Sequence, residues 1–170
     1  MKQHKGMRPH DIVVLVKIAA KHKNVWMMKD LAYELGISAS EISESINRSI
    51  IAGLIAPDKR RLMKLALLEF LEHGLRYVFP QQPGAMVQGI KTAHSALPLS
   101  EQIISDEHYV WPYAEGNVRG QGIIPLHPNV PVACLGDADF YKLMALCDAL
   151  RVGKVREKNL AVEHLRSILV

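Results

Sequence analysis

The chain has 170 residues, of which 49% are hydrophobic and 22% charged, an ordinary composition for a globular protein with a buried core. No apolar run approaches the roughly 20 residues needed to cross a bilayer. The basic first residues lead into an amphipathic stretch rather than a signal sequence. These features argue against a membrane or exported protein, and we expect a cytoplasmic one.

The net charge of +4 is unevenly distributed along the chain. Residues 1–61 carry eleven Lys and Arg against six Asp and Glu, a net +5, so the remaining residues carry −1. A basic segment of this kind is typical of a surface that faces nucleic-acid phosphates, and an ordinary solvated surface is the alternative. Cys134 and Cys147 form no C-x-x-C motif, and we interpret them as buried thiols rather than a disulfide or a metal pair.

The first elements are a disordered basic tail over residues 1–7 and a helix. Pro9 suits the first turn of a helix, and the run HDIVVLVKIAAKH has a wide apolar face, so we expect a helix to about His22. Residues 24–27 follow as a short extended link, in which Trp26 is interpreted as a core anchor.

Residues 29–55 have the pattern of a helix-turn-helix. A first helix is expected over 29–35, ended by Gly36, which adopts a positive φ at almost no cost. Ser38 then serves as the N-cap of a second helix, with Glu41 completing an S-x-x-E capping box. Apolar residues Ile42, Ile46 and Ile50 mark the inner face of that second helix.

The other side of this helix is polar and suits DNA recognition. A helix fits the major groove, and its N-terminal turns reach the base edges. We expect Asn47 to contact a base edge and Arg48 to contact a phosphate or a guanine. The predicted DNA-contacting residues of this helix are Ser38, Ser40, Ser43, Glu44, Asn47 and Arg48. The alternative is that the helix pair is only a packing unit.

The run LAYELGISASEISESINRSIIAGLI resembles the helix-turn-helix of bacterial winged-helix regulators, the MarR-like kind in particular. The resemblance covers residues 10–62 at most, and it implies sequence-specific binding of double-stranded DNA, usually as a homodimer on an inverted repeat. The family's wing is a β-hairpin with a basic tip. Here residues 56–61 are short and run directly into an apolar stretch, so the wing is either reduced to that turn or interrupted by a helix. Lys59, Arg60 and Arg61 are candidate phosphate contacts, or else a solvated charge run.

The remainder of the chain matches no motif that fixes its role. We expect a helix over 62–73 ended by Gly74, a strand over 75–80 stopped by Pro80, and an irregular, partly β segment over 81–135. Two helices follow, one capped by Asp137 or Asp139 and one over about 155–169, as a hairpin that completes the core or forms a dimer seam.

The candidate site residues of the irregular segment are Thr92, His94, His108, Trp111, Tyr113, Arg119 and His127. The histidines lack a short ligand spacing such as H-x-x-x-H, so we expect no metal and no cofactor. An enzyme using His94, His108 and Arg119 is an alternative, but no activating constellation is visible around them, so we expect no enzyme.

These observations predict a mainly α (α+β) protein. Its parts are a winged-helix-like DNA-binding domain over 1–80 and a dimerisation, partner or effector domain over 81–170, which combines the irregular, partly β segment with the C-terminal helical hairpin. The predicted function is a cytoplasmic, sequence-specific transcriptional regulator, an autoregulating repressor acting as a homodimer. The alternative is an antitoxin-like protein-interaction module that binds and masks a partner protein from the same operon.

Overall fold

The computed structural model describes residues 6–22 and 25–170, and it has a mainly α fold with one small mixed sheet. The predicted fold class is confirmed at this level. Residues 1–5 of the predicted basic tail and Asn24 of the predicted link lie outside the described residues.

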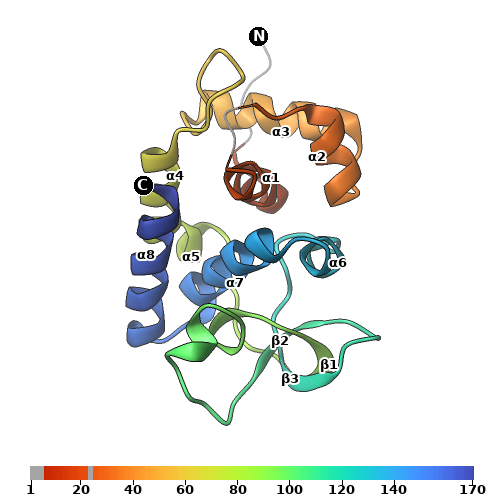
Figure 1. Cartoon of the computed structure of the whole chain (residues 1–170), viewed down its shortest axis with the longest axis vertical. Helices are drawn as coiled ribbons and strands as arrows, with labels where there is room; N and C mark the ends of the chain where they lie inside the picture. The colour runs from red at the N-terminus through yellow and green to blue at the C-terminus, as the bar shows by residue number, and fades with distance from the viewer. Residues whose placement is uncertain (1–5, 23–24) are drawn as a thin grey trace.

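Helix α1 (Pro9–Ala20) forms the central layer of the molecule. Helices α2 (Met28–Leu35) and α3 (Ala39–Ile51) cover it on one side, and α7 (Ala138–Val152) packs on the other (Figure 1). Every residue from Asp11 to Ala20 is buried. A helix that is apolar nearly all round requires neighbours on all sides, and this explains the unusually wide apolar face in the sequence.

Two charged residues of α1 are buried, and both form ion pairs with residues of neighbouring elements. Asp11 forms an ion pair with Arg48 of α3, with Nη2 and Oδ1 2.8 Å apart. The ammonium of Lys17 lies 2.7 Å from a carboxylate oxygen of Asp137 at the start of α7, and 3.5 Å from Glu34 of α2. The buried charges therefore tie α1 to the elements on both of its sides.

A short hairpin follows α3. Ile55 and Leu62 form an antiparallel β-bridge, the amide of Ala56 donates to the carbonyl of Arg61 at 2.9 Å, and Met63 donates to Leu54 at the same distance. We refer to residues 54–63 as the hairpin. The predicted helix over 62–73 then follows as α4 (Lys64–His73), with Gly74 after its last residue.

The strand predicted over 75–80 is wrong, because Leu75–Val78 form the one-turn helix α5. Only Leu75 of this turn is buried, while the three residues after it are exposed. A strand would bury every second side chain, whereas one buried residue per turn suits a helix. The amides of Tyr77 and Val78 accordingly both donate to the carbonyl of Gly74.

Three strands form the small sheet: β1 (Met86–Lys91), β2 (Tyr109–Pro112) and β3 (Val118–Gly122). Strand β1 pairs antiparallel with both others, and β2 and β3 pair parallel with each other, so the sheet closes on itself. Gly89 is required at one crossing, since a Cβ there would lie 1.9 Å from the carbonyl oxygen of Trp111. Two 3-10 turns, η1 (Ala93–Ser95) and η2 (Leu99–Glu101), lie between β1 and β2.

One part of the segment 81–135 departs from the expected loops and short strands. Residues Val130–Leu135 form helix α6, with Pro131 in its first turn. The β-branched valines of this stretch favour a strand by composition. Tertiary packing overrides that preference, because the helix buries Val130, Pro131 and Cys134 against α7 and α2.

The sheet is attached to α7 through a buried carboxylate. Asp148, which is fully buried, accepts hydrogen bonds from the Thr92 hydroxyl at 2.7 Å, the Trp111 indole at 2.6 Å and the Arg151 guanidinium at 2.9 Å. Burial raises the pKa of Asp148, against the opposing effects of Arg151 and the other donors. Arg151 also donates to the carbonyls of Phe79 and Ile124, so one ion pair organises several loops.

Both C-terminal helices form where they were predicted. Asp137 caps α7, its carboxylate accepting from the amide of Phe140 at 3.0 Å, and α8 spans Val155–Leu169. Helix α7 is buried for most of its length, and α8 packs on α7 and α4. Buried residues from both sides of residue 80 form one hydrophobic cluster, and the proposed domain boundary there stays a prediction. Within the described residues, every helix is too short or too polar to cross a membrane.

Candidate nucleic-acid interface

The turn between α2 and α3 has the conformation that its sequence predicts. Gly36 follows α2 with φ 64° and ψ 31°, a left-handed conformation that favours glycine. The next residue, Ile37, is buried. The side-chain amide of Asn129, which lies just before α6, donates to the carbonyl of Gly36 at 2.9 Å. The C-terminal half thus holds the turn from outside.

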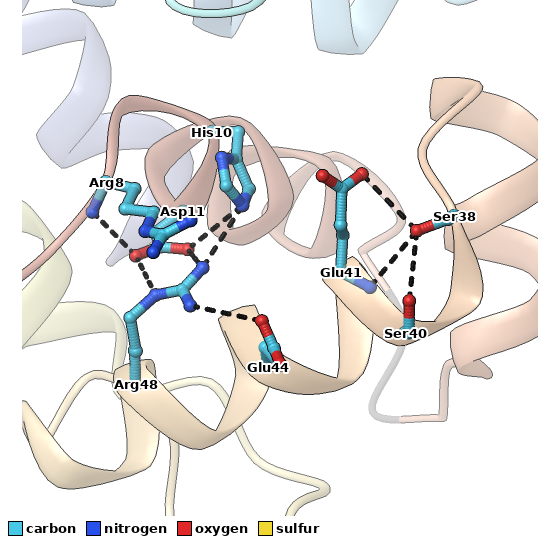
Figure 2. A network of polar contacts seen from close by, with 8 residues as sticks. All are labelled: Arg8, His10, Asp11, Ser38, Ser40, Glu41, Glu44 and Arg48. Atoms are coloured by element: carbon cyan, nitrogen blue, oxygen red, sulfur yellow. Dashed lines mark hydrogen bonds and ion pairs between the residues drawn. The ribbon is translucent and has the colours of Figure 1, made fainter. Parts of the chain in front are cut away.

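Ser38 begins α3 as its N-cap. Its hydroxyl oxygen accepts from the amide of Glu41 at 3.3 Å, which is the first half of the predicted capping box. The Glu41 carboxylate accepts from the Ser38 hydroxyl at 3.3 Å rather than from the Ser38 amide (Figure 2). The start of α3 is therefore fixed by side-chain hydrogen bonds.

The outer surface of α3 carries most of the predicted contact residues. Ser40, Glu44 and Asn47 are exposed, and Ser43 is half-buried at the edge of this surface. The inner surface is formed by Ile42, Ile46 and two buried serines. Four of the predicted residues therefore lie on or beside one accessible helix surface.

Arg48 differs from the other predicted residues, because its side chain is only 13% exposed and is directed at α1. Its Nε donates to Oδ2 of Asp11 at 2.9 Å, and its Nη2 donates to Oδ1 at 2.8 Å (Figure 2). The remaining Nη1 lies 4.0 Å from the carboxylate of Glu44. Such a bidentate pair occupies the edge of the guanidinium that would otherwise contact a guanine or a phosphate.

The charged forms of Asp11 and Arg48 are favoured by their mutual contact. Burial alone would raise the pKa of Asp11, but hydrogen bonds from the Arg48 side chain and from the amide of Arg8 outweigh it and hold that pKa below its ordinary value. The hydrogen bond with Asp11 raises the pKa of Arg48 further. The pair is therefore ionised throughout the physiological range.

His10 completes this cluster. Its Nε2 lies 3.1 Å from Nη2 of Arg48, and since a guanidinium only donates, this nitrogen accepts and the ring is neutral. Burial lowers the pKa of His10, and the charge of Arg48 adds to that effect. The His127 ring meets the His10 ring edge to face, with an angle of 78° between the ring planes and centroids 6.3 Å apart, and burial likewise lowers the pKa of His127.

The hairpin presents the other predicted contact residues. Lys59, Arg60 and Arg61 are all exposed, and none of their side-chain cations forms an ion pair with another described residue. The carboxylate of Asp58 accepts from the amides of Arg60 and Arg61 and so shapes the tip. Trp26 is half-buried, and its indole donates to the carbonyl of Arg60 at 3.0 Å, which fixes the hairpin to the chain before α2.

The hairpin and α3 lie at the same end of the molecule, while the sheet lies at the opposite end (Figure 1). The described arrangement therefore combines a capped helix with an accessible polar surface and a neighbouring loop with three unpaired cations. This combination suits a duplex, in which bases lie in a groove between two phosphate backbones.

The structure brings only some of the candidate site residues of the segment 81–135 together. His94 and His108 line one cavity, but Arg119 lies outside it. Thr92 and Trp111 are engaged by Asp148, Tyr113 is half-buried, and His127 lies beside His10. Among the described residues, no three His, Cys, Asp or Glu side chains are close enough together to hold a metal ion.

Asp11 and His10 are not among the site residues that the sequence predicts. A signal was present, since HDIVVLVKIAA contains only two charged residues in an otherwise apolar helix. A buried charge requires a partner, and a lone Asp in such a helix predicts an ion pair with a distant cation.

Comparison of the chain with protein-family models, with curated proteins and with solved structures gives no match.

Proposed function

We propose that this chain is a sequence-specific DNA-binding transcriptional regulator of the winged-helix type. In this proposal α3 enters the major groove and the hairpin, as a reduced wing, contacts the adjacent phosphate backbone. The observation that carries the proposal is that a capped α3 with an accessible polar surface lies at the same end of the molecule as the hairpin, whose Lys59, Arg60 and Arg61 are exposed (Figure 1).

Base recognition falls to residues other than Arg48. The Asn47 amide matches the donor and acceptor pattern of adenine, and the Glu44 carboxylate is able to accept from the amino group of cytosine. Ser40 and Ser43 are suited to either bases or phosphates. Arg48 is assigned a positioning role, because its pair with Asp11 sets the distance between α3 and α1.

The remaining parts of the proposal follow from how such proteins reach useful affinity. A single module makes a small interface, so we propose a homodimer on an inverted repeat, acting in the cytoplasm. We further propose that the target lies upstream of the protein's own gene and that binding represses transcription. The segment 81–170 then supplies dimerisation, partner or effector contacts.

One observation favours a second function, that of an antitoxin-like module that masks a partner protein. The exposed surface of α3 has Glu41 and Glu44 but no unpaired cation, and such a surface repels phosphates. Two large apolar side chains, Tyr33 and Ile51, are also 90% and 61% exposed on α2 and α3. A basic protein partner would complement this surface as well as the major groove of DNA would.

The test is a fluorescence-anisotropy titration of the purified protein against the duplex upstream of its gene, beside a scrambled duplex, over a series of salt concentrations. The proposal predicts tight binding to the upstream duplex and weak, steeply salt-dependent binding to the scramble. Equal binding to both would remove sequence specificity from the proposal. Failure to bind either at low salt would leave the protein-partner function, for which co-purification from the native host is the next measurement.

A further inference from the structure

Two adjoining cavities lie in the half of the molecule opposite α3. One has a volume of about 330 Å³ and the other about 240 Å³, and Lys91, Ser95 and Ser100 line both. We call the two together the sheet-end groove. Its walls come from the end of β1, from the turns η1 and η2, and from the first turns of α7.

The lysine and acidic side chains that line the groove are unequal in number, since lysines are present and no Asp or Glu is among the described lining residues. Lys91 and Lys142 line it, their ammonium groups form no ion pair with any described residue, and no described Asp or Glu lines either cavity. Glu157 lies 3.6 Å from Nδ1 of the lining residue His94, but it lines neither cavity.

A nearly buried hydroxyl adds a donor to these cations. Ser95 is 8% exposed, and its oxygen accepts from the amide of Tyr109 at 2.9 Å. His94 Nε2 lies 2.8 Å from the carbonyl of Glu107, which only accepts, so this nitrogen carries a proton and gives Ser95 nothing to donate to. The hydroxyl hydrogen of Ser95 therefore finds no acceptor among the described residues, and Ser100 offers a second hydroxyl in the same wall.

The remaining lining combines His94, Ser105 and His108 with apolar side chains. Ala96, Leu97 and Tyr141 border one cavity, and Ile103 and Ile104 border the other. The Tyr141 hydroxyl donates to the carbonyl of Lys91, which joins α7 to the end of β1 across the groove. A pocket with a few convergent polar groups and apolar walls is the usual form of a small-molecule site.

From these contacts we infer that the sheet-end groove binds a small organic anion with one oxyanion head and a short apolar body. Lys91 and Lys142 attract the head, Ser95 and Ser100 donate hydrogen bonds to it, and the apolar walls cover the body. A carboxylate and a phosphate share this chemistry, and the experiment separates them. The inference does not depend on DNA binding, because none of these residues belongs to α3 or the hairpin.

The test is calorimetric titration of the full chain with four probes: hexanoate, hexyl phosphate, inorganic phosphate and hexylammonium. We expect both alkyl anions to bind, the tighter one identifying the preferred head, and hexylammonium to give no heat. Amide chemical shifts of residues 91, 95, 100 and 142 should move on titration. Binding of hexylammonium as tight as that of hexanoate would overturn the inference, as would inorganic phosphate binding as tightly as hexyl phosphate.

Matched variants locate the site. Lys91→Gln and Lys142→Gln should each weaken binding of the alkyl anions about tenfold, as expected for the loss of one charged hydrogen-bond donor. Lys154→Gln removes an exposed lysine of the same half that lines neither cavity, and should leave affinity unchanged. Ser100→Leu fills the shared wall at an exposed position without changing charge and should abolish binding. Equal affinity in all four variants would place the bound anion elsewhere and refute the assignment.

Discussion

The Arg48 guanidinium donates two hydrogen bonds to the fully buried carboxylate of Asp11, of 2.9 Å from Nε and 2.8 Å from Nη2. The two residues are 37 positions apart and join the candidate recognition helix to the central helix. This relationship changes what an arginine substitution measures. The sequence predicts Arg48 as a DNA contact, whereas in the structure its removal would leave the buried carboxylate of Asp11 unpaired.

We therefore predict that Arg48→Ala lowers the free energy of unfolding by about 3–5 kcal/mol, the usual cost of removing one member of a buried ion pair. Arg48→Lys should recover only part of this loss, because an ammonium cannot make the bidentate contact. The measurement is equilibrium urea unfolding. The double variant Asp11→Leu, Arg48→Met should be more stable than Arg48→Ala, and finding it less stable would contradict the assigned pairing.

The titration of Asp11, His10 and His127 should make the free energy of unfolding depend on pH. The folded-state pKa of Asp11 lies below its ordinary value of 3.8, so its contribution is complete above that value and is lost as pH falls through the folded pKa. His10 and His127 have pKa values below 6.5, so the unfolded chain takes up protons first and stability falls as pH drops below 6.5. Unfolding titrations at a series of pH values check both windows. The variant His10→Gln, His127→Gln should flatten only the upper one.

Asn47→Ala should weaken binding to the specific duplex by about 1–3 kcal/mol and leave binding to a scrambled duplex unchanged, since Asn47 is exposed on α3 and is assigned to a base. Unfolding curves should coincide with those of the wild type because the residue has no buried contact. Anisotropy titrations on both duplexes provide the measurement. An equal loss on both would show that Asn47 contacts the backbone instead.

Replacing Lys59, Arg60 and Arg61 by glutamine should weaken binding to both duplexes alike. Each cation that contacts a phosphate contributes about 0.9 to the slope of log affinity against log salt, so the triple variant should lose up to about 3 from that slope. Lys154→Gln, which removes an exposed lysine outside α3 and the hairpin, is the control for a general effect of net charge on binding. An unchanged slope in the triple variant would remove the hairpin from the interface.

Gly36 and Gly53 form a matched pair for backbone strain. Both have positive φ, 64° and 79°, and alanine at either should cost about 1–2 kcal/mol for that reason. A Cβ at Gly53 meets nothing within 4 Å, whereas one at Gly36 lies 3.0 Å from the Asn129 amide nitrogen. Gly36→Ala should therefore cost roughly 1 kcal/mol more than Gly53→Ala, through the displaced hydrogen bond. In an Asn129→Ala background that difference should disappear, as measured by urea unfolding.

The parts of the fold that the sequence predicted well depend on local rules. Ser38 and Glu41 predicted the start of α3, and Gly36 predicted the end of α2, because each acts on amides or angles within a few residues. For the start of α7 the sequence offered Asp137 or Asp139, and the structure shows Asp137 as the cap. The elements that were missed depend on distant packing. Helix α6 forms from a strand-like composition, and nothing local indicates that β2 and β3 pair in parallel.

The candidate site divides in the same way. The exposure of Ser40, Glu44 and Asn47 follows from helical periodicity, which places them opposite Ile42 and Ile46. The buried position of Arg48 does not follow from periodicity. Periodicity gives only the side of the helix on which a residue lies, and the partner of Arg48, Asp11, lies on another helix. A side chain as long as arginine reaches across a helix boundary, so its contacts are fixed by tertiary structure.

The central position of α1 has a consequence for how this protein is handled. A fragment ending at residue 80 would keep α2 and α3 over one side of α1 but would strip α7 from the other, exposing apolar side chains and leaving Lys17 without Asp137. Such a fragment should aggregate rather than fold. Limited proteolysis of the intact chain should likewise yield no stable helix-turn-helix core, and heating should melt both halves in a single cooperative transition.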